Sequence, residues 1–514
     1  MKVTDCNDKK IKRVLIVGGG TSGWIAAASL SHLYNHADLN IRLVESQEIA
    51  TVGVGEATVP HIRYFNARLG LDEREFMKST QATFKLGNEF RNWGREGLRY
   101  AHPFGAFGES VAGVGFHHHW VRAHKKGLAS EIGDYALSVQ MMNKGRFALP
   151  DKDPQSVLST FSYAYQFDAY LYAAYLRKYS EARGVVRTEG KVTHVEQHPE
   201  TGDVTAIQLA SGERIVADLF IDCTGFHGLL IEQTLKTGYE DWSHWLPNDR
   251  AWAVNCEIRE GHLPLTRNTA HKVGWQWRIP LQHRLGNGYV HSSAFIDEQD
   301  ALDTLMNNLE GPTLTEPKLL KFVTGKRKKQ WNKNVVAIGL SSGFLEPLES
   351  TSIHLIHLAV TNLVEMFPDK DFRDEDRDEY NRIMSMEYTR VRDFLILHYH
   401  ATERTDSEFW NYCRTMEIPD ALKYEMDLFR QRAVVVNYKQ KFFLEPSWLS
   451  VYFGQGVMPD SYDPLSERLN DAELEALMVH TKSRIDQAVD AMPSNGAFLE
   501  AYCPGSVTPE KALH

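Results

Sequence analysis

The stretch IKRVLIVGGGTSGWIAAASLSHL, residues 11–33, decides the fold. Its β-rich run at 14–17 leads into three glycines, and an alanine-rich segment with helical character follows. The next segment, NIRLVES at 40–46, has the composition of a second strand that ends in an acid. Strand, glycine turn, helix and strand in this order predict a βαβ unit at the start of an α/β fold.

The glycines have the spacing of a dinucleotide-binding loop. Gly18, Gly20 and Gly23 form G-x-G-x-x-G, and Glu45 follows 22 residues after Gly23. Gly18 permits the tight turn, Gly20 lets a pyrophosphate approach the backbone, and Gly23 allows the helix to pack closely on the strand. The helix N-terminus faces the phosphates, and Glu45 can bind ribose hydroxyls. We therefore expect a bound dinucleotide.

NAD and FAD share this fingerprint, so the loop alone does not choose between them. The chain has no second convincing fingerprint, which indicates one dinucleotide rather than a flavin plus a nicotinamide. The position of the loop near the N-terminus, with DCTG at 222–225 and VVAIG at 335–339 far downstream, favours FAD. Further strands are expected at 190–196, 204–209, 215–222 and 334–339, and residues 372–435 should be helical.

The composition excludes several other classes of protein. With 514 residues, the chain has room for two to three domain-sized units, and its net charge of −10 argues against nucleic-acid or anionic membrane partners. The five cysteines form no CxxC pair, and the adjacent histidines of HHHW (117–120) cannot all face one ion, so we expect no metal site. The scattered cysteines indicate a reduced, cytoplasmic setting. A polar N-terminus and the lack of a long apolar run predict that there is no signal peptide and no membrane span.

A second informative stretch is FLEPLESTSIHLI at 344–356, which places Glu346 and Glu349 around Pro347. These carboxylates either cap a helix or perform chemistry. Apolar residues at helical spacing predict a helix after the Ser-Thr-Ser run, with Ser350, Thr351 or Ser352 as its N-cap: Ile353, Ile356, Val360, Leu363, Val364 and Phe367. Glu346 is interpreted as support for the loop or the helix N-terminus.

Four motifs together resemble the flavin-dependent halogenases of the tryptophan-halogenase type. They are GVGEATVP (53–60), DLFIDCTG (218–225), GWQWRIP (274–280) and FLEPLEST (344–351). The W-x-W-x-I-P signature of the family is formed by Trp275, Trp277, Ile279 and Pro280. The resemblance extends from residue 12 to about residue 465, nearly the whole chain.

The resemblance implies an α/β fold in which a Rossmann-like FAD-binding module, of the glutathione-reductase-type flavin monooxygenase fold, is interleaved with a mainly helical substrate module. We assign residues 1–100 and 150–370 to the FAD and halide module, and 101–149 and 371–514 to the substrate module. The implied cofactor-binding residues are Gly18, Gly20, Thr21, Ser22, Gly23, Glu45, Glu56, Ala57, Thr58 and Gly339.

The reaction implied by the resemblance starts from reduced FAD, delivered by a separate NAD(P)H-dependent flavin reductase. O2 converts this FADH2 to a C4a-hydroperoxide, and chloride or bromide attacks it to give hypohalous acid. The acid then travels through an internal tunnel to a lysine beside an aromatic substrate. The two tryptophans of the signature, Trp275 and Trp277, keep the substrate away from the flavin.

Two catalytic residues carry over from the family onto this chain. The lysine falls in QATFK and is Lys85, and the glutamate falls in PLES and is Glu349, followed by Ser350. Lys85 presents the halogen, while Glu349 holds Lys85 and stabilises or deprotonates the arenium intermediate. From the sequence alone, a lysine such as Lys85 would most often be a solvated residue on a helix. The family binds halide at backbone amides in STG, which here reads STS and makes Thr351 and Ser352 the halide residues.

The substrate pocket is predicted from two segments. YAHPFG (100–105) resembles a family element near the organic substrate and provides His102 and Phe104. The segment FFLEPSWLSVYFGQG (442–456) is shorter than the stretch with which tryptophan-specific relatives grip the amino acid, and Trp448 and Tyr452 are expected to line the cavity. This favours an indole or phenol without amino-acid charges, or a larger aromatic metabolite, over free tryptophan.

Two other functions compete with halogenation. Flavin-dependent aromatic hydroxylases of the same broad fold usually carry Gly-Asp at the strand end that corresponds to AIGLSS (337–342). This chain has Leu340 in place of the Asp, and it has both Trp275 and Trp277. A catalytically silent flavin-binding homologue is the third hypothesis, and the presence of both Lys85 and Glu349 argues against it.

Overall fold

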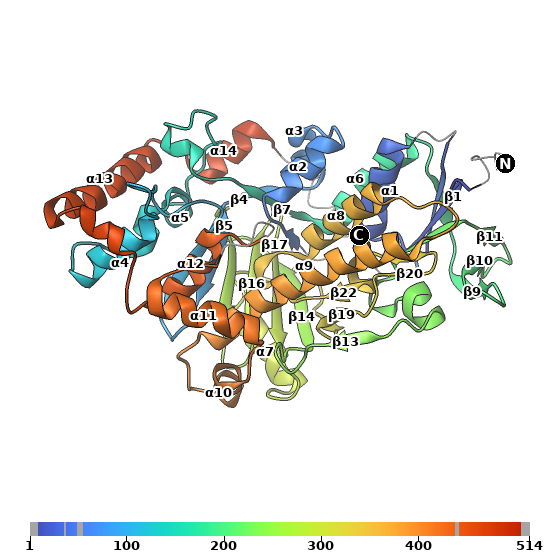
Figure 1. Cartoon of the computed structure of the whole chain (residues 1–514). Coiled ribbons are helices and arrows are strands. Elements are labelled where there is room, and N and C mark those ends of the chain that lie inside the picture. The colour runs from blue at the N-terminus through green and yellow to red at the C-terminus, as the bar shows by residue number, and fades with distance from the viewer. Residues whose placement is uncertain (1–8, 35–37, 49–54, 437–441, 505–514) are drawn as a thin grey trace, which may run out of the picture.

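The computed structural model of the chain describes residues 9–34, 38–48, 55–436 and 442–504 (Figure 1). The predicted βαβ unit is confirmed as β1 (Arg13–Val17), α1 (Thr21–Leu33) and β2 (Asn40–Glu45). It belongs to a six-stranded sheet in the order β20-β21-β12-β1-β2-β8, parallel except at the edge strand β20. The remaining strands of this sheet are β8 (Val186–Glu189), β12 (Leu219–Asp222), β20 (Trp331–Asn332) and β21 (Val335–Ala337).

Strand β1 is covered on both faces, as expected of a central parallel strand. Val14 and Ile16 face the main core together with Trp24 of α1, whereas Leu15 and Val17 face a second apolar cluster behind the sheet. Successive side chains of a strand point to opposite faces, so the aliphatic run at 14–17 supplies both layers. This arrangement holds the glycine turn at the carboxyl end of β1, where dinucleotides bind in such sheets.

The strand predicted at 215–222 is in fact two strands. β11 (Arg214–Val216) pairs in a separate three-stranded sheet with β10 (Val204–Leu209), which also pairs with β9 (Val192–Gln197), whereas β12 lies next to β1. The chain breaks at Asp218, whose carboxylate accepts hydrogen bonds from the backbone N–H groups of Lys12 and Arg13, both at 3.0 Å. This polar anchor to the entry of β1 redirects the chain, and the prediction of one continuous strand is wrong for that reason.

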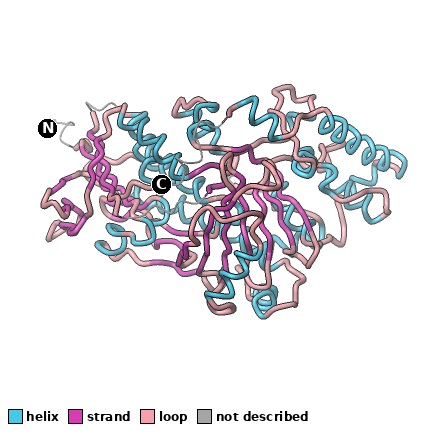
Figure 2. The backbone as a smooth tube through the Cα atoms, turned by 180° about the vertical axis from the view of Figure 1, so that it is seen from behind, coloured by secondary structure: helices cyan, strands magenta, loops and turns pink. Residues whose placement is uncertain are grey.

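A large second sheet carries much of the remaining core and occupies the middle of the molecule when it is seen from behind (Figure 2). Its order is β18-β14-β17-β16-β15-β5-β6, antiparallel except between β15 and β5. The strands are β5 (Gly87–Arg91), β6 (Arg99–Pro103), β14 (Arg250–Cys256), β15 (Thr266–Ala270), β16 (Trp275–Pro280), β17 (Leu285–His291) and β18 (Lys318–Lys321). The W-x-W-x-I-P signature is therefore strand β16.

The remaining strands form two smaller sheets. The first, in the order β3-β7-β4, is antiparallel and consists of β3 (Gly55–Ala57), β7 (Ala164–Asp168) and β4 (Thr83–Lys85). The second, in the order β13-β19-β22, consists of β13 (Tyr239–Asp241), β19 (Gly325–Arg327) and β22 (Gly343–Phe344). Strand β4 ends in Lys85, and β22 leads into the loop that carries Glu349.

The helices confirm the two helical predictions. Residues 372–435 form α9 (Asp374–His400), α10 (Glu408–Thr415) and α11 (Asp420–Arg432), and the helix after the Ser-Thr-Ser run is α8 (Ser352–Glu365). In Figure 1 the long helix α9 runs across the front of the molecule, and α4, α5 and α13 gather at the end opposite β1. The other α-helices are α2 (His61–Arg68), α3 (Glu73–Ser79), α4 (Phe116–Lys125), α5 (Leu137–Asn143), α6 (Ala169–Glu181), α7 (Glu298–Asn307), α12 (Glu445–Gly454), α13 (Asp471–Asp490) and α14 (Asn495–Tyr502).

Two features are absent from the part of the chain that the structure describes. None of its helices combines the length and the apolar character needed to cross a membrane. Its His, Cys, Asp and Glu side chains form no group of three or more that could hold a metal ion. The histidines of HHHW lie on α4, where all three are buried.

Candidate active site

The glycine loop has the shape that a bound dinucleotide requires. Gly18 has a φ of +110°, and a Cβ added there would overlap the backbone oxygen of Cys223. A Cβ on Gly23 would likewise overlap the backbone oxygen of Gly18. At Gly20, by contrast, a Cβ meets no atom within 4 Å. The fold itself requires Gly18 and Gly23, while Gly20 borders open space at the N-terminus of α1, and this fits the pyrophosphate of FAD.

Glu45 at the end of β2 lies across this loop. Its carboxylate is bound by the guanidinium of Arg187, and one oxygen lies 3.4 Å from the indole nitrogen of Trp24. A Cβ on Gly19 would overlap the same carboxylate, so Glu45 is held directly beside the glycines. The predicted contact of Glu45 with ribose hydroxyls is compatible with this position and stays a prediction.

The other residues predicted to bind FAD come from two further segments. Ala57 on β3 is buried, and Thr58 donates a hydrogen bond from its hydroxyl to the backbone oxygen of Tyr165 at 2.7 Å. Burial raises the pKa of Glu56 to about 7. Gly339 has a φ of +77° and turns the chain against the first turn of α1, where a Cβ on Gly339 would press on the side chain of Ser22.

Lys85 is fully buried at the end of β4, which excludes the alternative of a solvated lysine on a helix. Its amino group donates a hydrogen bond to the hydroxyl of Ser350 at 2.7 Å and lies 5.2 Å from the ring centroid of Phe104. Burial lowers the pKa of Lys85 to about 7, against the attraction of Glu349, which raises it. Burial therefore favours the neutral amine form of Lys85 more than water does.

Glu349 lies in the same buried cluster and is held by three side chains from three elements. One carboxylate oxygen accepts from the amide of Asn88 at 2.6 Å and contacts Nδ1 of His102 at 2.8 Å. The other oxygen contacts Nε2 of His398 on α9, also at 2.8 Å. Burial alone raises the pKa of Glu349, but the attraction of His102 and the hydrogen bonds of both histidines hold it well below its usual range.

The expected direct grip of Glu349 on Lys85 is replaced by a different arrangement. Among the ion pairs of the described residues, none joins the two side chains, and Lys85 uses the neighbouring hydroxyl of Ser350 instead. Sequence reasoning also missed Asn88 and His398. Neither residue stands in a motif, and only the packing of β5 and α9 against the 344–351 loop brings them to Glu349.

Glu346 supports the signature strand rather than the helix N-terminus. It is fully buried, and one carboxylate oxygen accepts from Trp275 Nε1 at 2.9 Å, Tyr399 OH at 2.5 Å and Asn248 Nδ2 at 3.1 Å. Burial raises the pKa of Glu346, although these three hydrogen bonds lower it. Glu346 therefore supports the loop, and its specific partner is Trp275, the first tryptophan of the signature.

The signature strand β16 connects the loop of Glu346 to the strand of Lys85. Trp275, Trp277 and Ile279 alternate along β16, so they point to the same face of the sheet, and all three are buried. The backbone oxygen of Pro280 accepts a hydrogen bond at 2.6 Å from the hydroxyl of Thr83, two residues before Lys85. The motif thus fixes the position of β4, and its role in a tunnel stays a prediction.

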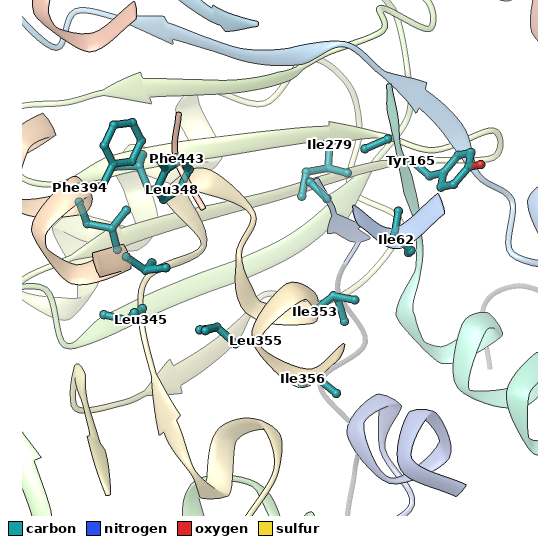
Figure 3. Close-up of a cluster of buried hydrophobic side chains, with 14 of the residues drawn as sticks. Ile62, Tyr165, Ile279, Leu345, Leu348, Ile353, Leu355, Ile356, Phe394 and Phe443 are labelled. Atoms are coloured by element: carbon teal, nitrogen blue, oxygen red, sulfur yellow. The ribbon is translucent and has the colours of Figure 1, made fainter. Parts of the chain in front are cut away.

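The start of α8 offers a place for an anion. Thr351 occupies the N-cap position but makes no capping hydrogen bond with its side chain, and its buried hydroxyl oxygen has no partner among the described residues. Ser350 before it has a φ of +59°, which turns the chain sharply into the helix. Figure 3 shows Leu348 on the preceding loop and Ile353 on α8 on either side of this turn. Uncapped N–H groups at a helix N-terminus favour anions, so the predicted halide residues Thr351 and Ser352 fit the site.

The predicted substrate residues separate into two groups. His102 and Phe104 lie beside Glu349 and Lys85, as described above. Trp448 lines a cavity of about 360 Å³ between α9, α11 and α12 together with Phe442 and Phe443. Tyr452 does not line this cavity, because it is buried and its ring stacks on Phe429 at a centroid distance of 4.0 Å.

Phe443 separates this cavity from the catalytic cluster. Its ring stacks on Phe394 at a centroid distance of 3.9 Å and lies 6.1 Å from the ring of His102. One wall of the cavity is therefore also a wall of the cluster around Glu349. Figure 3 shows Phe443 and Phe394 together beside Leu348.

Known proteins resemble this chain in both sequence and architecture. A profile of the tryptophan halogenase family matches residues 13–471. The flavin-dependent halogenase Xcc4156 of Xanthomonas campestris superimposes with a TM-score of 0.94 at 46% identity, covering 98% of this chain and 100% of that one. BrvH, a flavin-dependent halogenase of Brevundimonas sp. BAL3, gives a TM-score of 0.93 at 44% identity, covering 96% and 100%.

The sequence of a tryptophan halogenase is also similar to this chain along nearly its whole length. The tryptophan 6-halogenase SttH of Streptomyces toxytricini is 33% identical over 96% of this chain and 99% of its own length. The match covers the glycine loop, the W-x-W-x-I-P strand and the loop of Glu349 together, so it includes every part of the site described above. The chain belongs to the tryptophan halogenase family, whose members are flavin-dependent halogenases with a Rossmann-like FAD module.

Proposed function

We propose that this chain halogenates an electron-rich aromatic compound, using FADH2, O2 and chloride or bromide. The single observation that carries the proposal is the buried Lys85 amine, held by Ser350 in one cluster with Glu349. Burying a lysine and a glutamate in this way is costly, so their presence in one cluster favours a role in the chemistry. Reduced FAD, when bound, supplies the oxidising chemistry that turns O2 and halide into hypohalous acid.

The chain's own residues provide the binding sites for this chemistry. The open space at Gly20 and the N-terminus of α1 bind the FAD pyrophosphate, and Thr351 and Ser352 at the start of α8 bind halide. The tryptophans of β16, fixed through Glu346, form the wall that keeps the organic substrate from the flavin. We also propose that residues 1–100 and 150–370 act as the FAD and halide module and that 101–149 and 371–514 act on the substrate. Strand β6 (Arg99–Pro103) crosses the first of these boundaries.

Lys85 and Glu349 divide the chemistry on the aromatic ring. The Lys85 amine takes up the halogen and presents it to the ring at a fixed position, which gives the reaction its orientation. Glu349, held by Asn88 and His102, stabilises the positive charge that develops on the ring and accepts the displaced proton. Ser350 keeps the amine in place for both steps.

The proposed substrate is an indole, a phenol or a larger aromatic compound without amino-acid charges. The cavity is lined by the aromatic Phe442, Phe443 and Trp448 and by the charged Arg390, Asp393 and Glu425. It is of the size that holds small-molecule ligands, about 300 Å³ or more, and the aromatic side chains form the wall shared with the cluster. The proposed reaction also requires FADH2 from a separate NAD(P)H-dependent flavin reductase. SttH is by name a tryptophan 6-halogenase, but the substrate that we propose for this chain is not free tryptophan.

The test supplies FADH2 through a reductase together with O2, one halide at a time and a panel of indoles, phenols and tryptophan, and identifies products by mass spectrometry. We expect halogenated indole or phenol that depends on the added halide. Oxygenated product without halogen, at saturating halide, would instead identify an aromatic hydroxylase. Failure of the purified chain to bind FAD would refute the dinucleotide site itself.

A further inference from the structure

The carboxylate of Glu349 accepts hydrogen bonds on both of its oxygens. One oxygen is occupied by Asn88 and His102, and the other by Nε2 of His398 at 2.8 Å. All four side chains are 2% exposed or less, so water does not replace any of these partners. His398 approaches from α9, on the side of the carboxylate away from the amide of Asn88.

The second ring nitrogen of His398 determines how many protons the imidazole carries. Nδ1 lies 2.8 Å from the backbone oxygen of Phe394. A carbonyl oxygen only accepts hydrogen bonds, so Nδ1 must carry a hydrogen. In a neutral imidazole Nε2 is then bare, and it would face a carboxylate oxygen as one acceptor against another. Rotating the ring by half a turn gives no relief, because it places carbon atoms against both acceptors.

An additional proton must therefore lie in the contact between His398 and Glu349. It belongs either to an imidazolium or to a carboxylic acid. The ordinary pKa of imidazole, about 6.5, is higher than that of a glutamate carboxyl, about 4.3. The two further donors on the other oxygen, from Asn88 and His102, also favour the ionised carboxylate. These comparisons place the proton on His398.

Other titratable groups also face the pair, and their contacts differ from those of His398. From β4, the Lys85 amine bonds to Ser350 rather than to the carboxylate. From β6, His102 contacts Glu349 through Nδ1 only, so its ring is not held between two acceptors as the ring of His398 is. Tyr100, also on β6, stays a neutral phenol, because burial raises its pKa well above the ordinary value. On the side of α12, the uncharged Gln455 donates to the backbone oxygen of His398 at 2.9 Å.

We propose that Glu349 and His398 share a buried proton, so that the imidazolium of His398, and not the ammonium of Lys85, balances the charge of Glu349. His398 touches no reacting atom and is a positioning residue that acts through Glu349. The role of the pair in the reaction rests on the proposed halogenation, whereas the position of the proton does not.

The pair leaves Lys85 free to react as a neutral amine. Only an amine with its lone pair can bond to the halogen of hypohalous acid. In that step the N–halogen bond forms as the O–halogen bond breaks, and one amine proton leaves with the hydroxide as water. If Glu349 had no other cation, its charge would hold the proton on Lys85 and suppress this step.

The first test measures the proton directly, by nitrogen NMR of the histidine rings in the full chain with FAD bound. The signals of His398 are assigned by their loss in His398→Gln. We expect both ring nitrogens of His398 to be protonated at about pH 8, above the ordinary histidine pKa, and one to become bare in Glu349→Gln. A neutral His398 at this pH in the unaltered chain overturns the proposal. The readout needs no halogenation, so it stands even if the proposed function fails.

The second test follows halogenation against pH in His398→Gln. Without the imidazolium, Lys85 keeps its proton to higher pH, so the acidic limb of the profile should move up by about one pH unit, with roughly a tenfold loss at pH 7 that recovers in base. His400→Gln is the matched control, because His400 lies on the same helix and also contacts a backbone oxygen, that of Cys413 at 3.2 Å. Its profile should stay in place. An equal loss at every pH in His398→Gln would indicate a structural role only and overturn the proposal.

Discussion

The glycine loop and the cluster around Lys85 are built in opposite ways. The loop is one continuous stretch, residues 18–23, whose special conformation lies in its own backbone, although one of its close backbone contacts is with the distant Cys223. The cluster joins side chains from β4, β5, β6, α9 and the loop before α8, which lie up to 265 residues apart in contact with one another. The function of the glycine loop, a local site, therefore depends on backbone geometry. The function of the cluster around Lys85, a distributed site, depends on where charges and protons lie.

The largest effect is expected from a substitution that disrupts the glycine loop. Gly18→Val forces a branched side chain onto a φ of +110° and into the backbone of Cys223. We expect a loss of roughly 3 kcal/mol or more in the free energy of unfolding, with no FAD bound. Thermal unfolding followed by circular dichroism, together with flavin fluorescence, measures both.

Gly20→Ala is the matched control for this prediction. Its Cβ meets no protein atom within 4 Å, so the stability of the FAD-free chain should change by no more than about 0.5 kcal/mol. The added methyl group lies where the pyrophosphate approaches, and FAD affinity should fall by about tenfold or more, about 1.4 kcal/mol. Equal damage by both substitutions would show that the loop is merely structural.

The next-largest effect is expected from a substitution in the cluster around Lys85, which leaves the glycine loop unchanged. Glu349→Gln keeps the shape of the side chain but removes the charge that accepts the ring proton. We expect halogenation to fall by about 100-fold or more, since general bases contribute roughly 10²–10⁴-fold, while FAD affinity is unchanged. Product formation by chromatography and flavin titration test the two parts. A variant that halogenates at the unaltered rate contradicts the role of Glu349.

A smaller effect is expected at Ser350, which joins the two catalytic residues. Ser350→Ala leaves the Lys85 amine without its hydrogen-bond acceptor, and a loss of about tenfold in kcat should follow from an unsatisfied buried group worth about 1–3 kcal/mol. Ser350→Gly removes the same hydroxyl but relieves the φ of +59°, so it should be at least as stable as the alanine variant. Melting curves and steady-state rates of both variants separate the hydroxyl from the backbone; equal kcat in all three proteins would exclude a contribution from the hydroxyl.

The smallest effect concerns the start of α8. Thr351→Val replaces a buried hydroxyl that lacks a partner among the described residues, so the stability should change by less than about 1 kcal/mol. If the hydroxyl contributes to halide binding, the KM for bromide should rise by about two- to tenfold, as expected for one hydrogen bond. An unchanged KM would leave only the backbone N–H groups as the halide site.

The difference between the two sites also explains what could be predicted from the sequence. The βαβ unit, the helix after Ser352 and the helices after residue 372 follow from local periodicity, and the structure has all of them. The break at Asp218 depends on a bond to the entry of β1, which no local pattern reveals. Lys85 and Glu349 were found through family motifs, but their surroundings were not. Asn88 and His398 carry no motif, because their contacts with Glu349 arise only when β5 and α9 pack against one loop.

The central claim is that the buried amine of Lys85 delivers the halogen, and Lys85→Met tests it most directly. Methionine fills nearly the same volume without an amine, and it should not destabilise the fold, since the site already lowers the lysine pKa to about 7 by burial. The assay follows FADH2 oxidation, free hypohalous acid with a chemical trap, and halogenated aromatic product in the same reaction. We predict unchanged flavin oxidation, trapped hypohalous acid and a loss of product of about 100-fold or more. Halogenation of the aromatic substrate by Lys85→Met at the rate of the unaltered chain would contradict the account.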